Sequence, residues 1–349
     1  MINILVTAIG GSGHGEQVLK ALLLANRKEF RIFGADSDSG CPQKSLVYDF
    51  QVLPSASSPN YETELFALLD KFQIKVLIHG CEPEMQFFLK IKHLLESRGI
   101  LILMNNKEVI NLCTNKLLTG MRLNELGFQC PKFQEVSSIE EIEEIDWFPV
   151  VVKPKTGSGG SKNVFICQTK FELVNLARYL TGEFGILDIM IQEYVGTFDQ
   201  EFTVGVLSDL DGNFINSIAL RRKMSGQLNI RSSVSNQTGN AKFGSKLVIS
   251  SGVSHGEIAE FNEVRRQCEA IAKSIGSTGP LNIQCRFVDG VVNVFEINPR
   301  FSGTTSLRAL VGFNEPELLI KRHILGETIE PRFKFRNATI IRTLHENIL

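Results

Sequence analysis

Short apolar runs and segments with helically spaced apolar residues alternate through the first third of the chain. The strand candidates are 2–7, 31–35, 75–79 and 100–104, and the helix candidates are 16–26, 61–72 and 85–98. This alternation is typical of a doubly wound α/β sheet, whose ligands bind beyond the carboxyl ends of the strands. The pattern therefore predicts an α/β domain over 1–105 with a ligand site at one sheet edge.

A strict alternation of apolar and polar residues returns near the other end of the chain. Leu281–Phe287 and Val291–Arg300 alternate with period two, and Asp289 and Gly290 stand between them. Two alternating runs joined by Asp-Gly predict a β-hairpin, because both residues tolerate the positive φ of a tight turn.

Polar side chains gather on this hairpin if its pairing register aligns the two polar faces. Gln284 and Arg286 share one face of the first strand, and Glu296 and Asn298 share one face of the second. A carboxylate on a largely apolar strand is costly unless something binds it. Oxygen ligands suit Mg²⁺, and an arginine such as Arg300 suits phosphate oxygens. We therefore favour a Mg²⁺ and phosphate site over a solvated hairpin face.

A glycine- and serine-rich segment in the middle of the chain predicts a second phosphate contact. An apolar run ends in Lys153, residues 156–161 read Thr-Gly-Ser-Gly-Gly-Ser, and another apolar run covers 164–167. The Walker pattern is absent, and the segment joins two strands rather than a strand and a helix. Small residues still let backbone N–H groups approach phosphate oxygens. We favour a phosphate-covering flap over a plain hairpin loop.

The segment after the apolar run 188–192 can offer backbone groups to a planar base. Glu193 to Val195 follow that run directly, and Glu201 starts the next strand, where its carboxylate could take ribose hydroxyls. Alone, the segment would be a surface turn with two acids; beside the flap, the nucleotide interpretation is favoured. Lys116 stands near a helix start, where positive charge is unfavourable, so it either points outward or reaches an anion.

The glycine-rich turn at 10–15 does not complete a dinucleotide fingerprint, because the third glycine would fall at Glu16. The turn is either a packing device or part of a small-ligand site. Asp36 at the end of the second strand keeps a nicotinamide cofactor as a minor alternative. Glu82 either receives a substrate ammonium or complements a helix dipole, the role that we expect for Glu84.

The composition mainly excludes classes of partner and of cellular location. A formal net charge of −1 argues against nucleic-acid binding, and no apolar run is long enough to span a bilayer. Seven cysteines without a C-x-x-C pair fit reduced thiols, and the N-terminus lacks the basic flank of a signal peptide. We expect a cytoplasmic protein without nucleic-acid or membrane partners. The apolar helices of the first domain leave a homodimer open.

The order of these segments resembles the ATP-grasp superfamily. Residues 263–285 and 294–303 are similar to one half of the carbamoyl-phosphate synthase large subunit. The resemblance covers the whole chain. It implies a Rossmann-like pre-ATP-grasp α/β domain over 1–105 and then a two-part α+β ATP-grasp fold, with an N-terminal subdomain over 106–187 and a C-terminal subdomain over 188–349.

The same resemblance implies a role for each matching residue. The nucleotide-binding set is Lys116, Lys153, Gly157, Ser158, Gly159, Gly160, Ser161, Glu193, Tyr194, Val195 and Glu201. The ligands of Mg²⁺, with Mn²⁺ as an alternative ion, are Gln284, Glu296 and Asn298. The catalytic residues are Arg300, Lys153 and Arg222. The substrate set is Gly11, Ser12, Gly13, Glu82, Arg231, Ser302 and Arg308.

Carbamoyl-phosphate synthase carries two such modules in one long chain, whereas this chain carries one. The resemblance therefore implies an ATP-dependent ligase that joins a small carboxylate to an amine through an acyl phosphate, releasing ADP and phosphate. Two alternatives stay open: a half-enzyme that phosphorylates a carboxylate or carbamate, and a nucleotide-binding protein without turnover. The polar segment 225–255 is either a mobile substrate loop or two weakly patterned strands.

Overall fold

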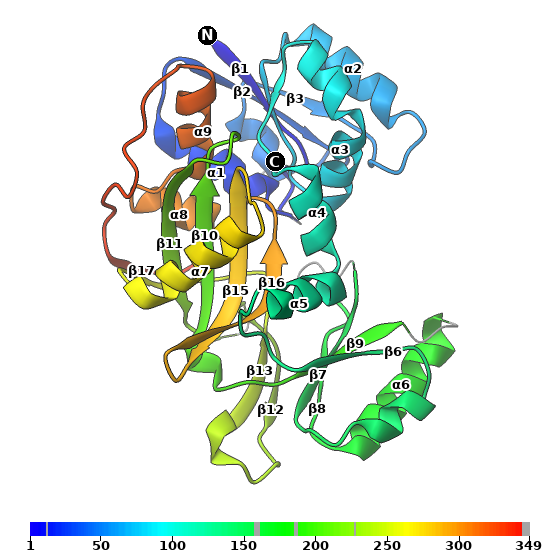
Figure 1. Cartoon of the computed structure of the whole chain (residues 1–349). Coiled ribbons are helices and arrows are strands. Elements are labelled where there is room, and N and C mark those ends of the chain that lie inside the picture. Colours follow the sequence, from blue (N-terminus) through cyan, green and yellow to red (C-terminus); the bar gives the residue numbers. More distant parts are fainter. Residues whose placement is uncertain (12, 157–160, 185–187, 227, 344–349) are drawn as a thin grey trace.

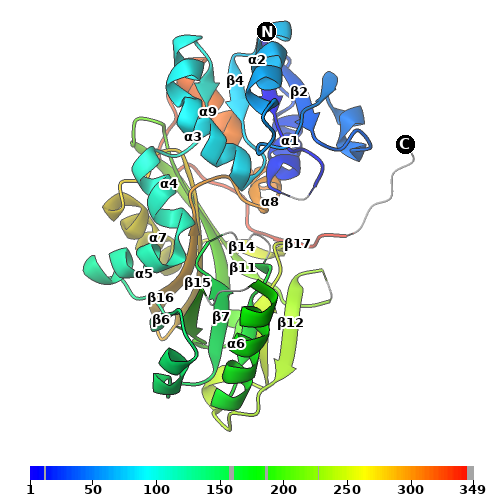
Figure 2. The ribbon, with the colours of Figure 1, turned by 90° about the vertical axis from the view of Figure 1, so that its right-hand side faces the viewer.

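The computed structural model describes the chain apart from residues 12, 157–160, 185–187, 227 and 344–349. Its strands form a five-stranded, a four-stranded and a six-stranded sheet, together with a two-stranded hairpin. Figures 1 and 2 show the first sheet at one end of the molecule, the four-stranded sheet at the other and the six-stranded sheet between them. Within the described residues, no helix has both the length and the apolar character needed to cross a membrane.

The N-terminal domain is a parallel sheet in the order β3-β2-β1-β4-β5. Its elements are β1 (Ile2–Val6), α1 (Gly15–Ala25), β2 (Phe30–Asp36), the 3₁₀ turn η1 (Pro42–Leu46), β3 (Asp49–Val52), α2 (Tyr61–Lys71), β4 (Val76–Ile78), α3 (Glu82–Ser97) and β5 (Leu101–Ile102). Central strands are buried on both faces, which confirms the predicted doubly wound sheet. The sequence did not predict β3, because this edge strand is partly exposed and has no apolar run.

The four-stranded sheet is antiparallel in the order β6-β9-β7-β8. Its elements are β6 (Phe133–Val136), the 3₁₀ turn η2 (Glu140–Glu144), β7 (Val150–Pro154), β8 (Phe165–Cys167), α6 (Lys170–Phe184) and β9 (Ile189–Glu193). Leu173 and Ala177 of α6 pack into the core of this sheet. Because β9 pairs with both β6 and β7, the sheet continues to Glu193, and the boundary expected after residue 187 was placed too early.

The six-stranded sheet is antiparallel in the order β16-β15-β10-β11-β14-β17. Its elements are the 3₁₀ turn η4 (Phe198–Gln200), β10 (Glu201–Ser208), β11 (Phe214–Arg222), β14 (Gly256–Ala259), α7 (Asn262–Ser274), β15 (Pro280–Val288), β16 (Val291–Asn298), α8 (Thr305–Leu310), α9 (Glu315–His323) and β17 (Ala338–Ile340). One face packs against α7 and against α4 (Lys107–Thr114) and α5 (Lys116–Glu125), whose apolar residues share its core. The other face packs toward α8 and α9.

The N-terminal domain and the six-stranded sheet share one core. Val18 and Leu22 of α1 cluster with Leu307 of α8 and Leu319 of α9. This packing brings the glycine turn before α1 and the start of α3 to the end of the β15–β16 hairpin. The relative position of the two units is therefore set by buried apolar contacts rather than by a linker.

Segment 225–255 contains β12 (Ile230–Ser235), the 3₁₀ turn η5 (Ala241–Phe243) and β13 (Lys246–Ser250). The two strands pair antiparallel as a separate hairpin, so the alternative of two strands holds for the described residues. Most side chains of β12 are exposed, and the strand therefore lacks the apolar alternation that would have identified it.

Candidate active site

A cavity of about 720 Å³, including its open mouth, lies between the four-stranded and the six-stranded sheets. It is lined by most of the described residues that the sequence assigned to a nucleotide: Lys153, Ser161, Glu193, Tyr194, Val195 and Glu201. The metal candidates Gln284 and Glu296 border it as well. Gly157 to Gly160 of the expected flap, and Ser12 of the expected substrate set, lie outside the described residues.

Lys153 stands on β7 at the wall of this cavity and is only 5% exposed. Its Nζ donates to Gln192 Oε1 at 2.7 Å and to the Phe295 carbonyl at 3.0 Å. Burial, reinforced by the positive charge of Lys116, lowers the pKa of Lys153 to about 7, although Glu296 opposes the shift. Both hydrogen-bond partners are neutral, so a phosphate oxygen would supply the anion that restores its charge.

Glu201 holds two arginines at the back of the cavity. Its Oε1 lies 3.2 Å from Arg222 Nη1, and its Oε2 lies 3.4 Å from Arg286 Nη2. Arg286 also stacks over the Tyr194 ring and donates to the Val195 carbonyl at 3.0 Å. The structure thus ties the carboxylate expected to hold ribose to an internal ion-pair network. This network positions the segment expected to read the base.

The predicted β15–β16 hairpin forms, and its register aligns the polar faces. Asp289 and Gly290 both have positive φ, as the turn requires. Gln284 lies opposite Glu296, and Gln284 Nε2 donates to Glu296 Oε2 at 2.8 Å. Asn298 lies two residue pairs further along, opposite Asn282, and lines a neighbouring cavity to which Glu296 also contributes.

The oxygen atoms on this hairpin fit a hard divalent cation. Glu296 supplies a carboxylate, and Gln284 and Asn298 supply amide oxygens beside it. One carboxylate with neutral oxygen donors suits Mg²⁺ that keeps waters and substrate phosphates as its other ligands. Zinc prefers sulfur and imidazole ligands, and neither kind is present among the described residues that line the cavity at Glu296 and Asn298.

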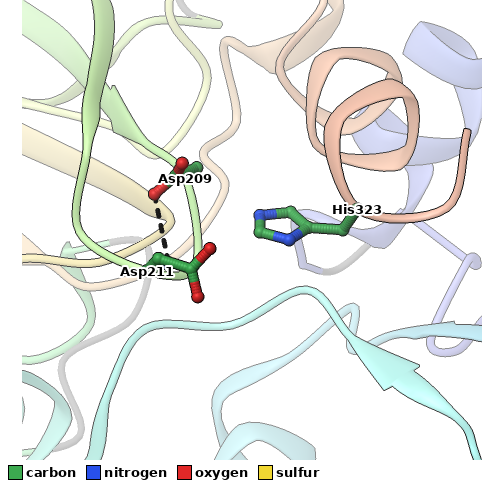
Figure 3. A group of neighbouring side chains, drawn as sticks. All are labelled: Asp209, Asp211 and His323. Atoms are coloured by element: carbon green, nitrogen blue, oxygen red, sulfur yellow. Dashed lines mark hydrogen bonds between the residues drawn. The ribbon is translucent and has the colours of Figure 1, made fainter. Parts of the chain in front are cut away.

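Asp209, Asp211 and His323 form a separate cluster at the β10–β11 turn and the end of α9 (Figure 3). His323 Nε2 already accepts from the Leu210 backbone N–H at 3.0 Å. Asp209 accepts from backbone N–H groups of the turn and from the Asn213 amide at 2.9 Å. These hydrogen bonds engage His323 Nε2 and both carboxylate oxygens of Asp209, so we interpret the cluster as a network that stabilises the turn.

A larger cavity of about 1,980 Å³ lies between the glycine turn, the start of α3 and the end of the hairpin. Gly11, Gly13 and Glu82 of the expected substrate set line it, together with Arg300. A third cavity of about 530 Å³ shares Glu296 with the nucleotide cavity and Arg300 with the large one. Arg222 and Ser302 line this connecting cavity.

Arg300 connects the hairpin with the N-terminal domain. Its Nη2 donates to Glu82 Oε1 at 2.8 Å and to Asn298 Oδ1 at 3.1 Å. Burial raises the pKa of Glu82, but the charge and hydrogen bond of Arg300, together with the charges of Lys116 and His79, outweigh burial and leave the pKa below its ordinary value. Glu82 therefore stays ionised and fixes the guanidinium at the junction of the cavities.

The glycines of the 10–15 turn serve close packing. A Cβ at Gly13 would lie 2.3 Å from the Gly80 carbonyl oxygen, and one at Gly15 would lie 2.3 Å from the Ala8 carbonyl oxygen. Asp36 accepts from the Gly10 N–H at 2.6 Å, so its carboxylate stabilises the turn and is not free for a ribose. This arrangement removes the basis for the nicotinamide alternative.

Two residues of the expected substrate set lie elsewhere. Arg308 is 1% exposed, pairs with Glu315 at 3.0 Å and donates to Asn282 Oδ1 at 2.6 Å, so it is a core ion pair. Arg231 is exposed on β12 and lines none of the cavities described above. Neither the pairing of Arg308 with Glu315, the first residue of α9, nor the exposure of Arg231 on a weakly patterned strand follows from a sequence motif.

Sequence reasoning gave no role to several residues that line the large cavity. His14, Gln17 and Arg342 stand on its wall, and His14 Nε2 lies 3.1 Å from Nδ1 of the buried His79. Burial, followed by the positive charge of Arg300, lowers the pKa of His79 to about 3. His14 follows the glycine turn directly and could have been found from that position, whereas Arg342 has no motif near it.

Comparisons with known proteins agree with this geometry. The family described as "ATP-grasp in the biosynthetic pathway with Ter operon" matches residues 186–345. The carbamoyl phosphate synthase large chain of Mesorhizobium japonicum is 26% identical over 267 residues, which are 72% of this chain and 22% of that protein. The chain of Mycobacterium tuberculosis is 28% identical over 222 residues, 62% of this chain and 18% of that one. This chain spans about a fifth of the length of these relatives.

Solved structures show the same fold. L-amino acid ligase from Bacillus licheniformis has a TM-score of 0.65 at 18% identity and covers 95% of this chain and 78% of its own. N5-carboxyaminoimidazole ribonucleotide synthetase from Thermotoga maritima has a TM-score of 0.64 at 16% identity, with coverages of 99% and 82%. The biotin carboxylase domain of Hydrogenobacter thermophilus 2-oxoglutarate carboxylase, solved with MgADP and bicarbonate, has a TM-score of 0.63 at 17% identity, with coverages of 95% and 71%.

Proposed function

Because the chain belongs to the ATP-grasp superfamily, we propose that it is an ATP- and Mg²⁺-dependent ligase that joins a small carboxylate to an amine. One observation carries the proposal. The nucleotide-type cavity and the large cavity meet at the β15–β16 hairpin, where Glu296 and Arg300 stand. A phosphoryl group held at this junction would be within reach of a substrate from the other side.

In the proposed reaction, a carboxylate oxygen of the substrate attacks the γ-phosphorus of ATP and ADP leaves. The amine then attacks the acyl carbon of the acyl phosphate. The C–N bond forms, phosphate leaves with the bond electrons, and the amine loses a proton. No residue of the chain needs to become covalently attached.

The chain supplies position and charge for these steps. Lys153, assisted by Lys116, would hold nucleotide phosphate oxygens, and Arg300, fixed by Glu82, would hold the transferring phosphoryl group. Glu296, with Gln284 and Asn298, would hold Mg²⁺, which when bound neutralises charge on the phosphates. Arg222 would act from the connecting cavity, where Glu201 keeps its guanidinium in place.

A second candidate follows from the similarity to carbamoyl phosphate synthase large chains: a half-enzyme that phosphorylates a carboxylate or carbamate and releases the product. A nucleotide-binding protein without turnover is less favoured, because the lysine, arginine and oxygen ligands that turnover needs line the cavities. Cytoplasmic location, a homodimer and the use of Mn²⁺ stay predictions.

Phosphate release tests the proposal directly. Amino acids and small carboxylates are supplied in pairs with Mg²⁺ and ATP, and each member is then omitted in turn. A ligase needs both an acid and an amine for full turnover, and hydroxylamine replaces the amine by trapping the acyl phosphate. Trapping at the same rate with and without the amine would favour the half-enzyme. ATP binding without phosphate release from any pair would favour the non-catalytic alternative.

A further inference from the structure

Arg342 lines the large cavity but has no part in the chemistry described so far. It follows β17, an edge strand that pairs antiparallel with β14 through Gly256 and Ile340. Figure 2 shows β17 beneath α1 and α8. The chain thus returns after α9 to place a guanidinium on the cavity wall beside Gln17, in the first turn of α1. This segment is part of the cavity and not merely a connection at its surface.

Uncharged oxygen atoms fix the Arg342 guanidinium. Its Nη2 donates to Gln17 Oε1 at 2.9 Å and to the Gly303 carbonyl. Gln17 is itself buried, and its Oε1 also accepts from Ser306 Oγ at 2.5 Å. The Arg342 Nε is buried and has no hydrogen-bond partner among the described residues. Within the part of the chain that the structure describes, the side chain is therefore held in place by neutral oxygens alone.

Five other arginines that are buried or half-buried do have a counter-charge. A carboxylate oxygen lies within 3.4 Å of each of Arg222, Arg265, Arg286, Arg300 and Arg308. Among the described residues, Arg342 has no carboxylate oxygen within 4.0 Å. Its nearest acidic neighbour on the cavity wall is Glu16, whose carboxylate is already bound by Lys20 at 2.7 Å and by Gln43 at 3.1 Å.

A cation removed from water without an anion is costly, and burial lowers the pKa of Arg342 as a result. An ion pair with a ligand would offset this cost. Arg300, the other arginine of the large cavity, is already paired with Glu82 and stands at the hairpin. Of the two arginines on this wall, Arg342 is the one without an ion pair among the described residues.

We propose that Arg342 binds an anionic group of a substrate, a carboxylate or a phosphate, that is separate from the reacting carboxylate. This inference rests on the proposed function, in which the reacting group of the substrate is a carboxylate. It narrows the substrate class, because one of the two substrates then carries a second anionic group, as a dicarboxylic acid, an amino acid acceptor or a phosphorylated metabolite does. An acid and an amine without such a group would leave Arg342 unpaired.

Thermal unfolding tests the anion site without any turnover. Arg342→Gln removes the charge, and Arg342→Lys keeps it. Arg336→Gln is the matched control, because Arg336 is exposed on the same segment and its side chain donates to the Leu310 carbonyl, outside the large cavity. Each protein is titrated with succinate or with inorganic phosphate against chloride at equal ionic strength. The anion that raises the unfolding temperature more, succinate or phosphate, shows whether the site prefers a carboxylate or a phosphate.

Wild type and Arg336→Gln should gain thermal stability from succinate or phosphate beyond the chloride effect. Arg342→Gln should lose this response while unfolding no earlier than wild type in chloride, and Arg342→Lys should keep part of it. A wild type without an anion response would overturn the proposal. So would an unchanged response in Arg342→Gln, above all if that variant unfolded earlier, because Arg342 would then only fasten the C-terminal segment.

Phosphate release adds a specificity readout. Succinate is compared with butyrate, and L-glutamate with 4-aminobutyrate, so that each pair differs by one carboxylate. Arg342→Gln should raise KM for the doubly anionic member about ten- to hundredfold, as expected for one charge-assisted hydrogen bond, and leave the other member unchanged. If no acid supports phosphate release, the proposed function fails, whereas the thermal titration still decides the role of Arg342.

Discussion

Nucleotide binding should be coupled to the uptake of a proton by Lys153. In the free protein this lysine is buried, bonded to a neutral amide and a carbonyl, and close to the positive charge of Lys116. Its pKa falls to about 7 from an ordinary value of 10.5. Nucleotide phosphates at the same wall of the cavity would favour the charged form, and the bound lysine would regain its proton.

The expected uptake follows from that pKa. At pH 8, a group with a pKa of about 7 is protonated in only ~10% of molecules, so full protonation on binding takes up ~0.9 proton per nucleotide. The unfolded chain carries this proton between pH 7 and 10.5, whereas the folded chain does not. Lys153 therefore makes the free energy of unfolding rise with pH in that window, by about 1.4 kcal/mol per pH unit at most.

Calorimetric titration of Mg²⁺-ADP in buffers with different ionisation heats measures the uptake. Lys153→Met should lose ~0.9 proton relative to wild type at pH 8 and bind ADP about ten- to hundredfold more weakly, because a charge-assisted hydrogen bond is lost. Lys155→Met is the control, since Lys155 pairs with Glu135 and stands outside the cavity lining. Equal proton uptake in wild type and Lys153→Met would refute the reasoning.

Three substitutions distinguish a core residue, a surface residue and a site residue. Arg308→Met leaves Glu315 buried without its partner and should lower the free energy of unfolding, measured by denaturant titration, by about 3–5 kcal/mol. Arg231→Gln changes an exposed residue and should alter the same free energy by less than about 0.5 kcal/mol. Equal effects of the two substitutions would contradict the assignment of Arg308 to the core. Glu296→Gln should abolish phosphate release and leave the denaturation midpoint unchanged, and turnover like that of wild type would exclude Glu296 as the Mg²⁺ ligand.

The sequence predicted those parts of the site that depend on local pattern. The alternation over 281–300 was sufficient for the hairpin, because its two strands are adjacent and Asp289-Gly290 fixes their turn. Lys153 and Ser161 were candidates because one precedes and the other ends the glycine- and serine-rich segment 156–161, which an ordinary hairpin loop does not need, and both line the cavity. The doubly wound sheet of the N-terminal domain was likewise predicted from one type of repeating unit, although its edge strand β3 was not.

Other parts depend on tertiary contacts that spacing does not encode. Glu201 was expected at a ribose because it starts a strand, but two arginines on other strands bind its carboxylate. Arg308 was expected in the substrate site, but Glu315 pairs with it in the core. Arg342 reaches the glycine turn only because β17 returns along β14, a short edge strand pairing without a sequence signature.

The transfer of oxygen from the acid substrate to phosphate tests the central claim most directly. An acid that supports phosphate release is labelled with ¹⁸O in both carboxylate oxygens, and the released phosphate is analysed by mass spectrometry. Activation through an acyl phosphate predicts one ¹⁸O in each phosphate, because the carboxylate oxygen that attacks the γ-phosphorus leaves with it. Phosphate without ¹⁸O, formed at the same rate as the amide, would contradict the account.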